Sequence, residues 1–124
     1  MISRNPSQVF YTYLDVETTG LDAAAGDRIC EIALLSVVDG RVADEYVTLV
    51  NPGRTIPQSA VSIHGIGDAM VSSAPYFRDI AQDVLDFMND SVVVAHNAPF
   101  DIGFLKMELA NIRAELPELH IIDT

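Results

Sequence analysis

Apolar and polar residues follow a strand pattern through the first part of the chain. Residues 9–16 (VFYTYLDV) are rich in aromatic and β-branched types, which favours a strand. Residues 28–38 are apolar at nearly every position, which predicts a second strand that is covered on both faces. Asp39-Gly40 is a tight-turn signal, and residues 42–50 return as a third strand. The pattern predicts a three-stranded antiparallel meander.

The second part of the chain alternates helices with short strands. Residues 51–74 carry Gly and Pro without a regular period, which predicts either an ordered loop or short helical turns. Residues 91–96 (SVVVAH) predict a short buried strand. Between them, with Pro75 near its first turn, a helix is predicted from an apolar stripe of Phe77, Ile80, Ala81, Val84, Leu85 and Met88.

A second helix is predicted after His96. Asn97 can cap this helix, and Pro99 falls in its first turn. Residues 119–124 (LHIIDT) begin another strand. The order β-β-β-α-β-α-β predicts an α/β fold with a mixed sheet covered on both faces, whose first strand lies near the middle. The buried side of the second helix is predicted to consist of Phe104, Leu105, Leu109 and Ile112.

Length and composition limit the chain to one compact domain. It has 124 residues, 49% of them hydrophobic, without a low-complexity run, an internal repeat or a linker-like stretch. No apolar run approaches membrane-spanning length, and the first residues lack a signal-peptide core, so we expect a cytoplasmic protein without membrane contact. The single cysteine, Cys30, lies in an apolar stretch and is expected to be a buried hydrophobic residue rather than a reactive thiol.

The net charge of −11 is opposite in sign to the usual charge of a nucleic-acid-binding protein. Binding of a polyanion would therefore require metal ions, local arginines or a partner protein, because the overall field repels phosphate. On charge alone, acidity that keeps a small domain soluble is the simpler interpretation.

Two carboxylates, Asp15 and Glu17, stand two residues apart where the first predicted strand ends. Residues i and i+2 of a strand share a face and lie roughly 6 to 7 Å apart. Two like charges at that distance repel by roughly 2 to 3 kcal/mol at an effective dielectric of 20. The pair costs little in open solvent, but a buried pair requires a cation between its members.

A third carboxylate, Asp101, lies in the first turns of the helix that follows residues 91–96. If that strand is the neighbour of the first one, all three carboxylates meet at the sheet edge where open α/β sheets bind ligands. Mg²⁺ and Mn²⁺ take oxygen ligands of this kind. Two such ions would activate a water for attack on a phosphodiester.

Three motifs together resemble one enzyme family. D-x-E-T-T-G at 15–20, H-G-I at 64–66 and H-N-A-x-F-D at 96–101 are similar in order and spacing to the DEDD-type 3′-5′ exonucleases. The resemblance is to the DEDDh branch, which includes the epsilon subunit of DNA polymerase III, RNase T and oligoribonuclease, and it runs from about residue 9 to the end. It implies a ribonuclease H-like fold and removal of nucleotides from 3′ ends with two ions of Mg²⁺ or Mn²⁺.

The same resemblance implies the 3′ end of single-stranded DNA or RNA as the partner, in proofreading or trimming, with a DNA polymerase subunit as a second partner. No residue of the sequence decides between DNA and RNA, because that choice depends on contacts to the 2′-hydroxyl. Asp15, Glu17 and Asp101 match the metal-binding catalytic acids of the family.

For the other candidate site residues, both a substrate contact and a purely structural role are possible interpretations. The resemblance implies that Thr18 contacts the terminal nucleotide, that Leu21 presses on the terminal bases and that Phe100 lies near the terminal sugar. Thr18 is equally explained as a turn residue, and Leu21 and Phe100 as core residues. His64 reaches the bound nucleotide or makes a structural hydrogen bond. Asn97, beside His96, belongs to the same group of substrate-side positions, and both residues are expected to fix the strand-to-helix turn.

The general base and fourth acid of the family, H-x-x-x-x-D in this branch, have no counterpart in the sequence. They are expected on a later helix, whereas the chain stops at Thr124. His120 and Asp123 have the wrong spacing. We therefore expect residues 1–124 to form a single exonuclease domain that is incomplete at its C-terminus, lacks the C-terminal helices and is weakly active or inactive alone.

A missing helix would leave an apolar sheet face exposed. A homodimer is the alternative way to cover that face. A non-catalytic module that keeps the acidic cleft to bind nucleic acid or a polymerase is the alternative function.

Overall fold

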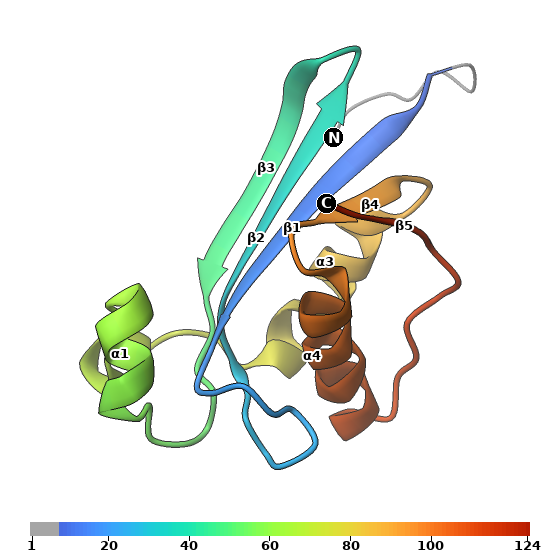
Figure 1. Cartoon of the computed structure of the whole chain (residues 1–124). Coiled ribbons are helices and arrows are strands. Elements are labelled where there is room, and N and C mark those ends of the chain that lie inside the picture. Colours follow the sequence, from blue (N-terminus) through green and yellow to red (C-terminus); the bar gives the residue numbers. More distant parts are fainter. Residues whose placement is uncertain (1–7) are drawn as a thin grey trace.

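The computed structural model describes residues 8–124 and contains one five-stranded sheet with four helices. Figure 1 shows the sheet crossing the molecule with the helices beside it and at its lower end. The strands are β1 (Phe10–Thr18), β2 (Ile29–Val38), β3 (Arg41–Leu49), β4 (Val92–Ala95) and β5 (His120–Asp123). The helices are α1 (Gln58–His64), α2 (Asp68–Val71), α3 (Phe77–Met88) and α4 (Ala98–Asn111).

The strand order is β3-β2-β1-β4-β5, which places β1 in the centre of the sheet. β1 pairs with β2, and β2 with β3, in antiparallel fashion, whereas β4 is parallel to β1 and β5 is parallel to β4. The predicted element order, mixed sheet and central first strand are therefore confirmed. For residues 51–74 the sequence predicted either an ordered loop or short helical turns, and the structure has two short helices there, α1 and α2.

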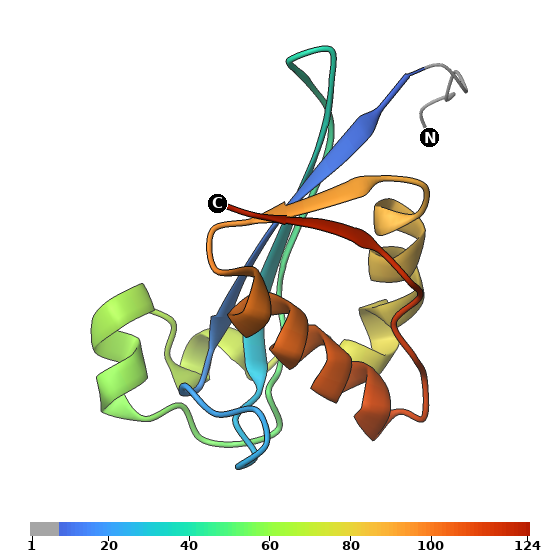
Figure 2. The same ribbon diagram turned by 45° about the vertical axis from the view of Figure 1, so that its right-hand side comes forward.

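Both long helices lie on the same side of the sheet (Figure 2). The side chains of β1 that face them, among them Leu14 and Val16, are buried. On the opposite face Tyr13 is 48% exposed and Val47 54% exposed. The prediction of cover on both faces is therefore wrong for residues 8–124. The apolar run of β2 does point both ways, but the described helices cover one side, which agrees with the expected bare sheet face.

Local signals set most element boundaries. Asp39 (φ 52°) and Gly40 (φ 74°) both have positive φ, as the predicted tight hairpin requires. Pro75 lies two residues before the start of α3 at Phe77 and is thus near the first turn, as predicted. There the carboxylate of Asp79 accepts a hydrogen bond from the Tyr76 N–H at 2.9 Å and so caps the helix.

A second, smaller core lies under α1 and α2. Cys30 is fully buried there with Ile56 and Ile66, which confirms its expected role as a small hydrophobic residue. Within residues 8–124, every helix is too short or too polar to cross a membrane.

A buried ion pair fixes α4 against the sheet. Glu108 is 2% exposed, and its carboxylate accepts hydrogen bonds from Arg28 Nε at 3.0 Å and Arg28 Nη2 at 2.6 Å. It also accepts one from the Ile29 N–H at 2.9 Å. The arrangement satisfies both carboxylate oxygens and holds α4 at the start of β2.

Replacing Glu108 by Ala should lower the free energy of unfolding by about 3 kcal/mol, because it leaves the Ile29 N–H and the Arg28 guanidinium without their acceptor. Urea unfolding followed by circular dichroism measures the change. The control is Glu115→Ala, at an exposed position after α4, which should shift stability by less than about 0.5 kcal/mol. A loss below about 1 kcal/mol at Glu108 would mean that solvent replaces the pair.

Candidate active site

Asp15 and Glu17 lie on the bare face of β1. Side chains alternate along a strand, so the burial of Leu14 and Val16 against the helices sends the two carboxylates to the other side. Asp15 is exposed and Glu17 is half-buried. The strand extends to Thr18, so both acids lie within it rather than after it.

Asp101 approaches β1 from α4. β4 pairs directly with β1, and the turn after β4 starts α4, which confirms the neighbouring strands on which the expected convergence depended. Asp101 is 6% exposed, and its Oδ2 accepts a hydrogen bond from the Val16 N–H at 3.3 Å. The third carboxylate is thus held against the strand backbone between the positions of Asp15 and Glu17.

The surroundings of Asp101 and Glu17 disfavour the charged form of both groups. Burial raises the pKa of Asp101 to about 6, and the charges of Asp15 and Glu17 add to this effect, while the Val16 N–H opposes it. Burial also raises the pKa of Glu17, and the neighbouring Asp15 and Glu31 raise it further, while His64, when it carries a charge, opposes this effect. A cation placed among these groups would relieve both the burial penalty and the repulsion.

Glu31 is a residue that the sequence analysis missed. It stands directly opposite Glu17 in the β1–β2 ladder, on the same face of the sheet. Only the register of β1 against β2 brings it there, and this register is regular from Phe10 to Glu17. A pattern of apolar residues does not encode which residues of two strands stand opposite each other.

Within residues 8–124, the side chains do not bring three His, Cys, Asp or Glu groups together as a ready-made metal cluster. Three carboxylates nonetheless supply the hard oxygen donors that Mg²⁺ and Mn²⁺ prefer, so the donor set fits these ions. Asp15 is exposed, unlike the buried Asp101.

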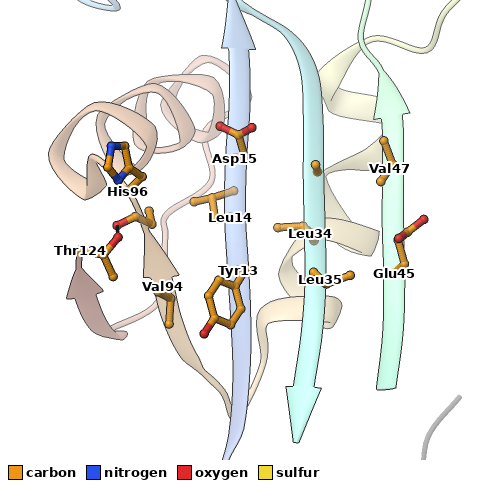
Figure 3. A pocket seen from close by; sticks show the side chains of 12 residues that line it. Tyr13, Leu14, Asp15, Leu34, Leu35, Glu45, Val47, Val94, His96 and Thr124 are labelled. Atoms are coloured by element: carbon orange, nitrogen blue, oxygen red, sulfur yellow. Dashed lines mark hydrogen bonds between the residues drawn. The ribbon is translucent and has the colours of Figure 1, made fainter. Parts of the chain in front are cut away.

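A groove opens beside Asp15 on the bare sheet face. Figure 3 shows Asp15 on β1 and His96, just after β4, on the same side of the sheet. The cavity measures about 550 Å³. Its walls combine apolar strand residues with a few polar groups, and they include Tyr13, Leu35, Val47, Val94, Glu45 and Thr124.

Side-chain hydrogen bonds hold the end of β1 and the turn that follows it. Thr18 is 7% exposed, and its hydroxyl donates to the Gly20 carbonyl at 2.6 Å. The Thr19 hydroxyl donates to Asp27 at 3.0 Å, and the Asp27 carboxylate lies so close to Gly20 that a side chain at position 20 would collide with it. Leu21 follows with 85% exposure and is therefore not a core residue. The turn presents an apolar side chain to solvent beside the acids.

Asn97 occupies the N-cap position of α4, but its side chain makes no capping hydrogen bond. The prediction that it caps the helix through its side chain is therefore wrong. Asp123, at the end of β5, accepts a hydrogen bond from the Ala98 N–H at 3.1 Å instead. Because Asp123 is 25 residues away in the sequence, only the parallel β4–β5 pairing reveals this contact.

Phe100 and His64 are both in contact with other parts of the protein. Phe100 is half-buried against Phe104, with ring centroids 4.8 Å apart. Nε2 of His64 lies 2.9 Å from the Thr18 carbonyl oxygen, and Nδ1 lies 3.0 Å from the Ile66 nitrogen. His64 therefore makes the structural hydrogen bonds that were one of its two alternatives.

The raised pKa of Asp101 predicts a pH-dependent stability of the metal-free protein. A folded-state pKa of about 6, against an ordinary value of 3.8, means that the folded state keeps a proton which the unfolded chain releases. The contribution of this group therefore falls as pH rises from about 4 to about 6 and is constant above that. Relative to the wild type, Asp101→Asn should become more stable by up to about 3 kcal/mol across this window.

Urea unfolding in chelator-treated buffer at several pH values measures this difference. Asp83→Asn, which changes an exposed acid on α3, is the matched control and should show no such trend. If the stability difference between Asp101→Asn and the wild type stays constant with pH, Asp101 is not a strained carboxylate.

Comparison with known proteins gives a consistent result. Residues 12–124 match the RNase_T family model, described as Exonuclease. A DNA polymerase III subunit epsilon-like protein of Rhodobacter capsulatus is 47% identical over 98 residues, which cover 77% of this chain and 14% of that protein. The DNA polymerase III subunit epsilon of Rickettsia prowazekii is 42% identical over 113 residues, covering 90% of this chain and 49% of the relative.

Among solved structures, the nuclease domain of 3′hExo, a DEDDh family member bound to rAMP, superposes with a TM-score of 0.76 at 17% identity. The superposition covers 94% of this chain and 66% of that domain, so it supports the ribonuclease H-like fold. The chain spans about half the length, or less, of these two curated relatives. The family match covers nearly all of the described residues, and the chain therefore belongs to the RNase_T family of exonucleases.

Proposed function

We propose that this chain forms the acidic half of a 3′-5′ exonuclease site, which hydrolyses phosphodiester bonds at nucleic-acid 3′ ends. One observation carries the proposal. Asp101, on a helix 85 residues away along the chain, is buried against the main chain of β1 between the positions of Asp15 and Glu17. Burying a carboxylate beside two others costs stability unless a cation binds there. Membership of an exonuclease family supports a catalytic role for such a cation site.

Asp15, Glu17 and Asp101 would hold two divalent cations, Mg²⁺ or Mn²⁺. When bound, such ions polarise the scissile phosphate and make the attacking water a stronger nucleophile. The contribution of the chain is to fix Asp101 through the Val16 N–H and to present Asp15 on the exposed face of β1. The ions would also offset the net charge of −11, which otherwise repels a polyanion.

The substrate is proposed to be the 3′ end of single-stranded DNA or RNA. Leu21 projects from the turn after β1 and is available to press on terminal bases. Thr18 is the last residue of β1, just before this turn, and Asn97 and Phe100 lie at the start of α4 beside Asp101. The Rickettsia relative bears the name of a DNA polymerase subunit, which supports proofreading beside a polymerase as the role.

The general base and the fourth carboxylate are proposed to come from outside these 124 residues. Both nitrogens of His64 already contact the main chain. His120, the first residue of β5, pairs with Val92 at the opposite end of β4 from the turn that leads to Asp101. The uncovered face around Tyr13 and Val47 also leaves room for a further helix or a second copy of the chain. A stop codon directly after Thr124 would contradict the proposal that the domain is incomplete.

Isothermal titration with Mn²⁺ tests the metal site. Asp15→Ala and Asp101→Ala should each weaken binding by at least about tenfold, because each removes one carboxylate ligand. Glu45→Ala is the matched control, since Glu45 lines the same groove from β3 but is not among the proposed ligands. Equal affinities in all four proteins would remove Asp15 and Asp101 from the metal site.

Release of nucleotides from 3′-labelled DNA and RNA oligonucleotides tests the activity. The 124-residue chain should be slower than a longer protein from the same reading frame by roughly 10²- to 10⁴-fold, the usual contribution of an acid-base group. Asp15→Ala in the longer protein should abolish release. A longer protein that binds Mn²⁺ and oligonucleotide but releases nothing would favour the non-catalytic binding module.

A further inference from the structure

The pairing of β1 with β2 is irregular where Glu17 lies. Glu17 stands opposite Glu31, whereas Thr18 stands opposite Ile29, so that Cys30 is an extra residue on β2. An extra residue of this kind bends the strand and redirects neighbouring side chains. The direction of the Glu17 side chain therefore depends on what stabilises this irregular point.

His64 contacts the strand at this point. Its Nε2 lies 2.9 Å from the carbonyl oxygen of Thr18, and the Cys30 Sγ lies 3.8 Å from the same nitrogen. Cys30 is fully buried, and burial raises its pKa to about 12, so the thiol stays neutral. The imidazole thus fills the space between the end of β1 and the extra residue of β2.

The two hydrogen bonds of His64 define one neutral tautomer. A backbone N–H only donates, so the Ile66 N–H, at 3.0 Å, requires a bare Nδ1. A carbonyl oxygen only accepts, so the Thr18 carbonyl requires a proton on Nε2. Neither ring nitrogen is left to bind a nucleotide or to take a proton from water.

The end of α1 holds the ring in this orientation. Gly65 has φ 75°, a left-handed conformation that suits glycine, and its N–H donates to the Val61 carbonyl at 2.7 Å. This turn brings the Ile66 N–H back to the ring of His64. The sequence His64-Gly65-Ile66 therefore orients the imidazole of His64 toward the end of β1.

We propose that His64 is a positioning residue, which through the Thr18 carbonyl fixes the irregular end of β1 and so the direction of Glu17. The metal-related part of this inference rests on the proposed function. It assigns His64 to the second of its two alternatives, because both ring nitrogens are engaged by the main chain.

Three proteins separate positioning from substrate contact: the wild type, His64→Ala and His64→Gln. The Gln side chain can donate from its amide to the Thr18 carbonyl, whereas Ala cannot. Mn²⁺ affinity, measured by titration without nucleic acid, should fall about tenfold in His64→Ala, which corresponds to one lost hydrogen bond, and should recover to within about twofold in His64→Gln. Unchanged affinity in a folded His64→Ala protein would overturn the role toward Glu17.

Nuclear magnetic resonance of the metal-free protein tests the hydrogen bonds independently of any metal. The ring nitrogens of His64 at pH 7 should show the neutral form protonated at Nε2. The Thr19 amide, which donates to the Arg28 carbonyl at 2.9 Å, should exchange faster in His64→Ala and regain its protection in His64→Gln. An imidazolium, or a ring protonated at Nδ1, would overturn the inference even if the wild type binds no Mn²⁺. Absence of Mn²⁺ binding with the expected ring signals would instead contradict the metal site alone.

Discussion

The parallel pairing of β4 with β1 determines where everything else in the candidate site lies. The pairing is short and joins Tyr11, Thr12 and Tyr13 to residues 92–94. It delivers the turn after β4, and with it the first turn of α4, to the end of β1 that carries Asp15 and Glu17. Without this pairing, nothing else described in the chain would place the start of α4, and so Asp101, beside Asp15 and Glu17. The Arg28–Glu108 pair then holds the far part of the same helix against β2.

Stability and charge are opposed at this edge of the sheet. Asp101 is nearly fully buried, and its pKa is raised because burial and two neighbouring carboxylates disfavour its charge. The rest of the molecule offsets this cost through apolar packing, with Leu105, Val84 and Ile29 fully buried in the main core. A strained, acidic edge supported by an ordinary core is the arrangement expected of a site rather than of a structural ion pair.

The sequence alone predicts the elements and the two acids of β1, because period-two alternation carries that information. The Asp39-Gly40 turn can also be predicted, because these two residue types tolerate the positive φ angles that a tight hairpin requires. Contacts that depend on strand register or on the order of strands in the sheet could not be predicted from the sequence. Glu31 faces Glu17 only through the long-range register of β1 against β2, and Asp123 replaces Asn97 as the cap of α4 only because β5 lies beside β4. The apolar run of β2 also does not reveal which of its faces is covered.

The separation of Val16 and Asp101 by 85 residues has a consequence for how the site forms during folding. The meander of β1, β2 and β3 closes through near neighbours in sequence, whereas the contact between α4 and β1 requires a long loop to close. Sequence separation therefore favours formation of the meander that carries Asp15 and Glu17 ahead of its contact with Asp101. Partly folded chains lack the complete acidic site, so cation binding would report completion of the whole domain rather than of any one part.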